Sequence, residues 1–275
     1  MPHDPRLLAT AIDIVLRAGD IQLAHFRQDY VITKKGTIDL VTEVDLEVER
    51  MCRAVLAERF PSHEILAEEM GGPAADAASS QYCWIFDPID GTTNYAHGLP
   101  IFCAALGLEI AGRIEVAAIY DPTRTELFTA ERGQGAYLNG ARMQVSQASH
   151  LVDAVLVTGF PYNVHEDADA LLGLFGDFLK QARAVRRLGS AALDMCYVAA
   201  GRLDGFWEAQ IRPWDMAGAS LLIEEAGGRV TMMDGSPFDP RGSSVLASNG
   251  PLHAPMLDII QRDWVNERRS RNRTS

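Results

Sequence analysis

Apolar residues near the N-terminus recur at the spacing of a helix. Asp4 and Pro5 have the character of a helix cap and first turn, and an apolar stripe through Val15 continues toward Phe26. A second apolar stripe begins near Thr42 and predicts a second helix. The string "EILA" then predicts a short strand, followed by a loop rich in Gly, Ala and Ser.

The middle and the end of the chain have different patterns. From residue 82 to about 145, apolar runs such as "YCWIFD" and "IEVAAIYDP" are separated by turn sequences, which predicts a series of strands. Farther on, the strand patterns "AVLVTGF" and "DGFWEAQI" alternate with helices expected over 167–182, after Gly189 and over 213–226. This order predicts an α/β fold of stacked α and β layers rather than a simple doubly wound sheet.

The length and composition favour one compact unit. A chain of 275 residues with 47% hydrophobic content can bury a sizeable core, and we expect a single domain over 1–265 with two lobes, 1–150 and 151–265. The basic tail 266–275 is expected to be disordered. No run of 18 apolar residues and no secretory signal pattern occurs, so the expected location is the cytoplasm.

The net charge and the cysteine pattern further limit the classes of function that fit this chain. A net charge of -12 opposes nonspecific attraction to nucleic acid and suits a protein that concentrates metal cations. The cysteines are scattered in apolar contexts without CxxC pairs, which predicts reduced core residues rather than disulfides or zinc ligands. They are Cys52, Cys83, Cys103 and Cys196.

The string "WIFDPIDGTTNY" carries the candidate chemistry. Asp87 and Asp90 follow an apolar run, and two carboxylates this close repel each other unless a proton or a cation intervenes. Oxygen ligands favour Mg²⁺, Mn²⁺ or Ca²⁺ over zinc, and Mg²⁺ is usual where a phosphate completes the coordination. The structural alternative is that these aspartates form an Asx turn before Gly91.

The residues after the acids point to phosphate. Thr92, Thr93 and Asn94 place hydroxyls and N–H groups where a helix N-terminus could hold an anion. Other phosphate chemistries lack their motifs: there is no GxxxxGK[ST] and no GxSxG, and the Asp-x-Asp pair at 167 and 169 opens a helix instead of following a strand. Direct attack of water on a phosphomonoester is the remaining route.

Four strings together resemble the inositol monophosphatase family, particularly its bacterial members: "ILAEE", "WIFDPIDGTTNYAHGLPIF", "GSAALDMCYVAAGRLDGFWE" and "RPWDMAGASLLIEEAGG". Their order and spacing match from about residue 5 to 262. The resemblance implies a metal-dependent, lithium-sensitive phosphomonoesterase. It also implies a homodimer and the alternating αβαβα sandwich of the sugar phosphatases.

Carried over by position, the resemblance implies a two-metal site. Glu68, Asp87 and the carbonyl of Ile89 would hold one Mg²⁺; Asp87, Asp90 and Asp215 would hold the second, and the family pattern allows a third, weaker one. Glu68 and Thr92 would orient the attacking water. Taken singly, Glu68 could be a solvated loop acid, Asp215 a helix N-terminal acid, and Trp214 a packing residue beside the site.

An N-terminal string, "KKGTIDLVTEVD", also resembles the family. The resemblance implies that Lys34 or Lys35, Asp39, Thr42 and Asp45 support the metal site from a flexible arm. Thr42 and Asp45 also have the spacing of a capping box, and the two roles are compatible.

The resemblance also implies which residues contact the substrate. Gly189, Ser190, Ala191 and Glu208 would contact the leaving alcohol, and Arg186 or Arg187 would supply positive charge near the phosphate. The other residues expected to bind substrate are Ile89, Asp90, Gly91, Thr92 and Asp215. Without the resemblance, Glu208 would be interpreted as an exposed strand-end acid and the arginines as solvated.

The sequence thus predicts a cytoplasmic enzyme that hydrolyses inositol monophosphate to inositol and phosphate by two-metal activation of water. Histidinol phosphate and fructose 1,6-bisphosphate are alternative substrates. A different class of function is an accessory protein of the transcription or RNA machinery, for which the tail "ERRSRNRTS" could serve. That alternative is less favoured, because a solvated, disordered terminus explains the tail better.

Overall fold

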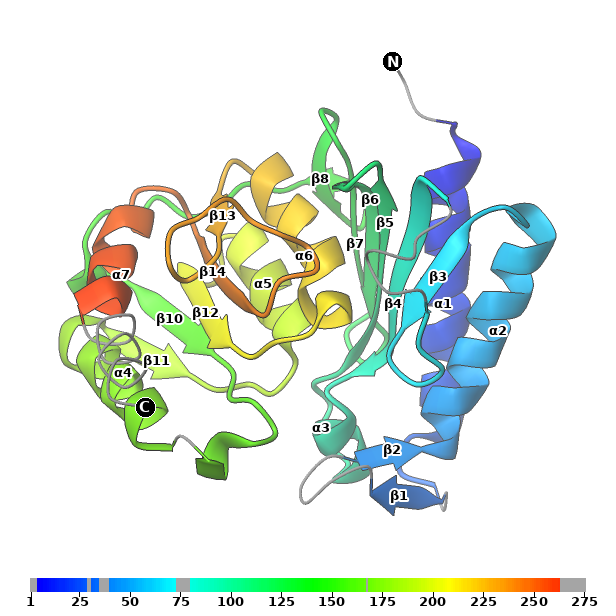
Figure 1. The fold of residues 1–275 in the computed structure, drawn as a ribbon, viewed down its shortest axis with the longest axis horizontal. Coiled ribbons are helices and arrows are strands. Elements are labelled where there is room, and N and C mark those ends of the chain that lie inside the picture. The colour runs from blue at the N-terminus through cyan, green and yellow to red at the C-terminus, as the bar shows by residue number, and fades with distance from the viewer. Residues whose placement is uncertain (1–3, 29–30, 35–39, 73–79, 167, 263–275) are drawn as a thin grey trace, which may run out of the picture.

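The chain folds into five alternating layers of helices and sheets (Figure 1). The structure, a computed structural model, describes residues 4–28, 31–34, 40–72, 80–166 and 168–262. Helices α1 (Arg6–His25) and α2 (Glu43–Arg59) cover the outer face of a seven-stranded sheet. Helices α5 (Ala191–Ala199) and α6 (Pro213–Glu225) lie between this sheet and a five-stranded sheet, whose far side packs against α4 (Ala168–Gln181) and α7 (His253–Ile260). The predicted layered αβαβα fold class is confirmed.

The seven-stranded sheet is antiparallel except at one edge, where β3 pairs parallel with β4. Its strands follow sequence order: β3 (Glu64–Ala67), β4 (Tyr82–Asp90), β5 (Cys103–Ile110), β6 (Arg113–Asp121), β7 (Glu126–Glu131), β8 (Gly135–Leu138) and β9 (Ala141–Arg142). The helix α3 (Thr92–Ala96) follows β4 directly.

The five-stranded sheet has the order β11-β10-β12-β14-β13 and is mixed. Strand β10 pairs parallel with both of its neighbours, and the other pairs are antiparallel. The strands are β10 (Val155–Thr158), β11 (Ala184–Arg186), β12 (Gly205–Ala209), β13 (Arg229–Thr231) and β14 (Ser244–Ser248). A separate hairpin pairs β1 (Ile32–Lys34) with β2 (Leu40–Thr42), and short 3₁₀ turns span Leu151–Asp153 and Val164–Glu166.

Most elements lie where the sequence pattern predicts them. The helix after Thr42 begins with the predicted capping box, in which the Thr42 side chain and the Asp45 carboxylate bond each other's backbone N–H groups. The short strands β11, β13 and β14 and the helix α7 were not predicted. The positions of Lys35, Asp39 and Asp167, part of the loop after "EILAEE" and the tail 266–275 lie outside the described residues, as does the side chain of Lys34.

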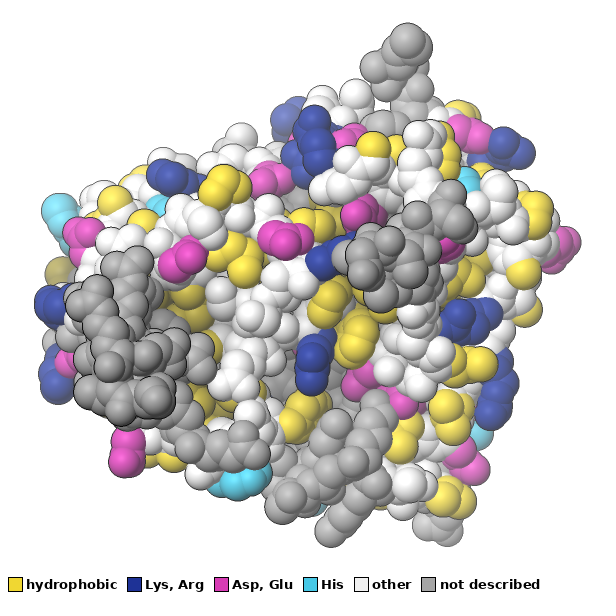
Figure 2. Space-filling view, viewed as in Figure 1, with side chains coloured by type: hydrophobic (Ala, Val, Ile, Leu, Met, Phe, Trp, Pro, Cys, Tyr) yellow, Lys and Arg dark blue, Asp and Glu magenta, His cyan; other side chains and the backbone are white. Residues whose placement is uncertain are grey.

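The surface and the cysteines also agree with the sequence. All four cysteines are buried thiols, as predicted. Figure 2 shows acidic and basic side chains interspersed over one face, and no large basic patch gathers on that face among the residues drawn in colour. Within the described parts of the chain, no helix combines the length and apolar character needed to cross a bilayer.

Helix α6 lies very close to the seven-stranded sheet. A Cβ atom added at Gly107 of β5 would lie 3.0 Å from the backbone nitrogen of Gly218 in α6, and one added at Gly218 would lie 3.1 Å from the Leu106 carbonyl oxygen. The helix and the strand therefore meet backbone to backbone. Because α6 also carries Asp215 one turn earlier, this contact sets the position of that acid.

We expect Gly218→Val to destabilise the protein by about 2–3 kcal/mol, because the added atoms must push α6 away from backbone atoms that cannot yield. Chemical denaturation measures the loss. The matched control is Gly173→Ala in α4, where a Cβ meets no atom within 4 Å; there the gain in helix propensity should stabilise the protein by about 0.5–1 kcal/mol. Equal effects of the two substitutions would contradict the close packing of α6.

Candidate active site

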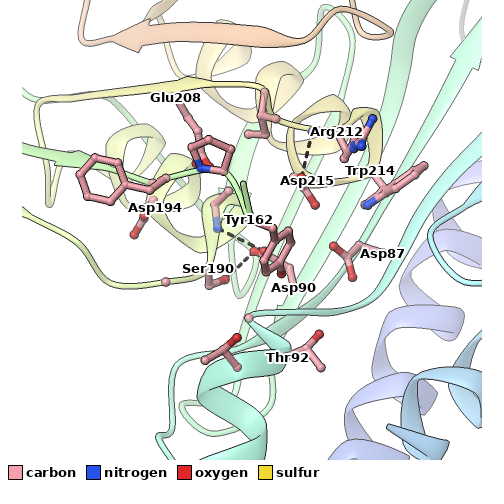
Figure 3. Close-up of a pocket in the computed structure, with 18 of the residues that line it drawn as sticks. Asp87, Asp90, Thr92, Tyr162, Ser190, Asp194, Glu208, Arg212, Trp214 and Asp215 are labelled. Atoms are coloured by element: carbon pink, nitrogen blue, oxygen red, sulfur yellow. Dashed lines mark hydrogen bonds between the residues drawn. The ribbon is translucent and has the colours of Figure 1, made fainter. Parts of the chain in front are cut away.

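A cavity of about 510 Å³ opens where the two sheets and the helices between them meet (Figure 3). The end of β4 supplies Asp87 and Asp90, and the residue after β3 supplies Glu68. Helix α6 supplies Asp215 from its first turn, and β12 supplies Glu208. Residues far apart in the sequence thus line one cavity.

Three aspartates form an acidic cluster in this cavity. Asp87, Asp90 and Asp215 each offer a carboxylate oxygen, and these oxygens all lie within 4.8 Å of one another. Burial raises the pKa of all three above its ordinary value, and the charge of Glu68 raises the pKa of Asp87 and Asp215 further. Buried carboxylates at this spacing become stable as anions when a cation joins them, and their oxygens suit a hard divalent ion.

A bulge in β4 aims two aspartates at one cavity. Residues three apart in a regular strand point to opposite faces of the sheet. The strand continues from Asp87 to Asp90, and its register against β5 shifts between these two residues. Such an irregularity turns both carboxylates to the same side. The Asx hydrogen bond is present as well: the Ile89 N–H donates to Asp87 Oδ1 over 2.9 Å.

Asp90 connects the two halves of the molecule. Its carboxylate accepts hydrogen bonds from the Ser190 hydroxyl and from the N–H groups of Ala191 (3.2 Å) and Ala192 (2.7 Å), at the start of α5. The aspartate from β4 therefore caps a helix that belongs to the second half of the chain. Ser190 and Ala191, expected at the leaving alcohol, line the cavity and also hold Asp90 in place.

Thr92 links the cavity to the N-terminal helices. Its hydroxyl lies 2.9 Å from the Ile89 carbonyl and 3.4 Å from Asp45 Oδ1. The other Asp45 oxygen accepts from the Thr42 N–H and hydroxyl, so the capping box fixes this buried carboxylate. The capping role and the supporting role weighed for Thr42 and Asp45 occur in one arrangement.

The neighbouring residues of the same string have different roles. Thr93 lines the cavity with Thr92, whereas the Asn94 side chain donates hydrogen bonds to the carbonyls of Ile101 and Leu188 and so joins the two halves of the chain. Gly91 has a φ of +98°, and an added Cβ would lie 2.9 Å from the Ile101 carbonyl oxygen. A glycine is therefore required where β4 turns into α3.

Glu208 lies on the side of the cavity away from Asp87 (Figure 3). Its side chain is buried, which excludes the alternative of an exposed strand-end acid. Burial raises the pKa of Glu208 to about 8, and the nearby Arg187 opposes that shift. Both Arg186 and Arg187 are exposed, but only Arg187 lines the cavity.

Comparison with known proteins adds to this geometry. Residues 4–264 match the sequence model of the inositol monophosphatase family. The chain belongs to this family. It is 41% identical to the Nus factor SuhB of Pseudomonas aeruginosa, over 93% of this chain and 96% of that protein, and 39% identical to the inositol-1-monophosphatase of Mesorhizobium japonicum, with the same coverage.

The fold agrees with that membership. The solved structure of the inositol monophosphatase from Anabaena superposes with a TM-score of 0.85 at 38% identity, over 94% of this chain and 96% of that chain. The resemblance to the inositol monophosphatase family drawn from four strings is thus confirmed over nearly the whole chain. The protein is a phosphatase of this family.

Several residues of the cavity were not predicted from the sequence. They are Gly159, Phe160, Pro161, Tyr162, Asn163, Asp194, Gln210, Ile211 and Arg212. The loop after β10 has no motif that marks it as part of a site. Asp194 did leave a signal, since it is a single acid within the otherwise apolar helix "AALDMCYVA". Trp214 lines the cavity and is partly exposed there.

Proposed function

We propose that this phosphatase hydrolyses inositol monophosphates or closely related polyol phosphates in a Mg²⁺-dependent reaction. The observation that carries the proposal is that one cavity joins an acidic cluster suited to cations with a second group of polar side chains, including Glu208, on another wall. A phosphate and its leaving alcohol need these two kinds of surface side by side.

The acidic cluster fits the metal ligands expected for the family. Glu68, Asp87 and the Ile89 carbonyl would hold one Mg²⁺, and Asp87 would share the second with Asp90 and Asp215. When bound, Mg²⁺ would neutralise these carboxylates and stabilise the charge that develops on the phosphate oxygens. The raised pKa values of the three aspartates support a cation here, because the cluster is otherwise electrostatically unfavourable.

Thr92 and Glu68 would position the attacking water. The Thr92 hydroxyl has one proton, so it can donate to either Asp45 or the Ile89 carbonyl, but not to both at once. When it donates to Asp45, its oxygen is free to accept a hydrogen bond from water and to orient the water oxygen toward phosphorus. The water oxygen would then bond to phosphorus as the bond between phosphorus and the alcohol oxygen breaks. One water proton would pass to the alcohol oxygen, and the other would stay on the phosphate.

The leaving alcohol would contact Glu208. The carboxylate of Glu208 would accept hydrogen bonds from polyol hydroxyls, while Arg187 can donate to them. Gly159 makes this placement possible, because a Cβ at that position would lie 1.9 Å from Glu208 Oε2. The position of the carboxylate thus depends on the absence of a side chain directly after the neighbouring strand β10.

A phosphate-release panel with Mg²⁺ tests the proposal. Inositol 1-phosphate, histidinol phosphate, fructose 1,6-bisphosphate and an aryl phosphate are compared by kcat/KM. We expect the highest value for inositol 1-phosphate and little release without a divalent cation. A higher value for histidinol phosphate or for the bisphosphate would overturn the substrate assignment, and full activity in excess chelator would overturn the metal assignment.

We expect Glu208→Ala to lower kcat/KM for inositol 1-phosphate about ten- to hundredfold above pH 8, where Glu208, with its pKa of about 8, is ionised. The loss corresponds to roughly 1.5–3 kcal/mol for a hydrogen bond to a charged group. Hydrolysis of the aryl phosphate should change much less. Gly159→Ala is the matched variant: it keeps the carboxylate but displaces it, and should reproduce the same selective loss. Equal losses on both substrates, or a large rise in the Mg²⁺ requirement, would contradict the role of Glu208.

A second candidate function comes from the similarity to a Nus factor of Pseudomonas aeruginosa. In this alternative the protein binds the transcription or RNA machinery, and phosphatase activity is secondary. Capture of transcription proteins by the purified chain, combined with an intact site that releases no phosphate from the panel, would favour it. The homodimer implied by the family is also a proposal, and light scattering of the purified protein measures it.

A further inference from the structure

Asp194 is a buried acid that the proposed reaction does not yet use. It lies in the first turn of α5, is 1% exposed, and lines the same cavity as Glu208. Its Oδ1 has no hydrogen-bond partner among the described residues. In Figure 3 its carboxylate lies on the side of the cavity where Glu208 also lies, away from Asp87 and Asp215.

The fold alone gives little reason for this carboxylate. An acid in the first helical turn interacts favourably with the helix dipole, but a buried carboxylate without a partner costs more than that interaction returns. The N–H groups at the start of α5 are already occupied, because those of Ala191 and Ala192 donate to Asp90. The buried acid Asp121 differs from Asp194, because its carboxylate accepts hydrogen bonds from Thr123 and Arg124.

The surroundings of Asp194 define what it could bind. Arg187 lines the same cavity, and its charge acts on both Asp194 and Glu208. The wall therefore combines two carboxyl groups with one guanidinium. A hydroxyl group suits such a wall because it can donate one hydrogen bond to a carboxyl group and accept another from the guanidinium.

We propose that Asp194 is a specificity-determining residue that accepts a hydrogen bond from a second hydroxyl of the leaving alcohol, next to the one bound by Glu208. This inference rests on the proposed phosphatase function and refines its substrate class: the preferred leaving group carries several hydroxyls. An alcohol whose only oxygen is the one bonded to phosphorus has no hydroxyl that could donate a hydrogen bond to either carboxyl group. Selectivity for polyol phosphates over aryl phosphates then depends on both acids.

The test compares kcat/KM for inositol 1-phosphate and 4-nitrophenyl phosphate in the Mg²⁺-loaded enzyme. We expect Asp194→Ala to lower the value for inositol 1-phosphate about tenfold or more and the aryl value less than about twofold. Asp194→Asn keeps the shape and one acceptor oxygen, so its selective loss should be smaller, about threefold. The Mg²⁺ concentration for half-maximal rate should not change with either variant.

A stability measurement separates binding from a structural role. The melting temperature of the metal-free Asp194→Asn protein at neutral pH should rise. Burial raises the pKa of Asp194, so the folded wild type must either protonate this carboxyl or bury its charge, and asparagine avoids that cost. Asp121→Asn is the control: it should lower the melting temperature and leave the ratio of the two kcat/KM values unchanged. An unchanged ratio in Asp194→Ala, or equal losses on both substrates, would overturn the proposal.

Failure of the proposed function has a different signature. If the wild-type enzyme releases no phosphate from inositol 1-phosphate but hydrolyses the aryl ester, the inositol assignment is wrong. The same ratio is then measured with glycerol 2-phosphate as the polyol substrate. A selective loss in Asp194→Ala would still support the polyol contact, and an unchanged ratio would overturn it. Should the alanine variant not fold, the asparagine variant decides by the same criterion.

Discussion

Replacing Asp87 by asparagine is expected to lower kcat/KM about a thousandfold or more. The expected ligand of both metals would lose its charge, and the several kcal/mol that a metal site contributes to the transition state correspond to a factor of this size. Mg²⁺-dependent phosphate release measures the effect. Near-normal release would contradict the assignment of Asp87 as a shared ligand.

The same substitution should stabilise the metal-free protein. Asparagine can still accept the hydrogen bond from the Ile89 N–H, while the repulsion that Glu68, Asp90 and Asp215 exert on the carboxylate disappears. Because the folded-state pKa of Asp87 is raised, the metal-free wild type loses stability as the pH rises above about 4, the unfolded value. The variant should lose less over that range, and added Mg²⁺ should stabilise the wild type far more than the variant.

Replacing Asp90 by alanine is expected to abolish turnover and also to unfold the protein more easily. Two N–H groups of α5 and the Ser190 hydroxyl lose their acceptor. Hydrogen bonds to a charged group contribute about 1.5–3 kcal/mol each, and the relief of repulsion offsets only part of the sum. We expect a net loss of roughly 2–4 kcal/mol by denaturant titration.

Ser190→Ala is the matched control for Asp90. It removes one donor and leaves both N–H groups bonded to the carboxylate, so it should cost only about 1 kcal/mol. Two aspartates three residues apart thus have opposite expected effects on stability, although we expect each to be required for activity. If Asp90→Ala proved as stable as the wild type, the capping of α5 by Asp90 would be unimportant in solution.

The sequence located the acidic cluster because its members lie in compact strings. Asp87 and Asp90 follow an apolar strand. Asp215 was assigned to the cluster through the family resemblance, because its own pattern indicates only an acid in the first turn of a helix. What no string contains is the bulge that turns both β4 aspartates to one side. That geometry depends on the pairing of β4 with β5, which the local sequence pattern does not encode.

Other features could not be predicted, because tertiary packing alone creates them. The parallel pairing of β10 with β12 places Gly159 against Glu208, although 48 residues of chain separate the two. The sequence around neither residue predicts this contact. The choice between Arg186 and Arg187 depends on the direction of one strand-end side chain. The strands β13 and β14 are too short to establish a periodic pattern.

The layer formed by α5 and α6 has a consequence for the synthesis of the protein on the ribosome. The main apolar cluster contains Cys83 and Ile119 of the first sheet, but also Leu193 and Ile223 from helices translated much later. At roughly 5–20 residues per second, the stretch from 142 to 225 takes seconds to complete. During that time the inner face of the seven-stranded sheet has no partner.

A nascent chain in this state exposes a broad apolar surface that favours aggregation and recruits chaperones. The first half of the chain therefore cannot be treated as a self-sufficient folding unit, because the covering of its sheet is encoded in the second half. The yield of active protein in a host should depend on chaperone supply and on translation speed through the segment that precedes α5.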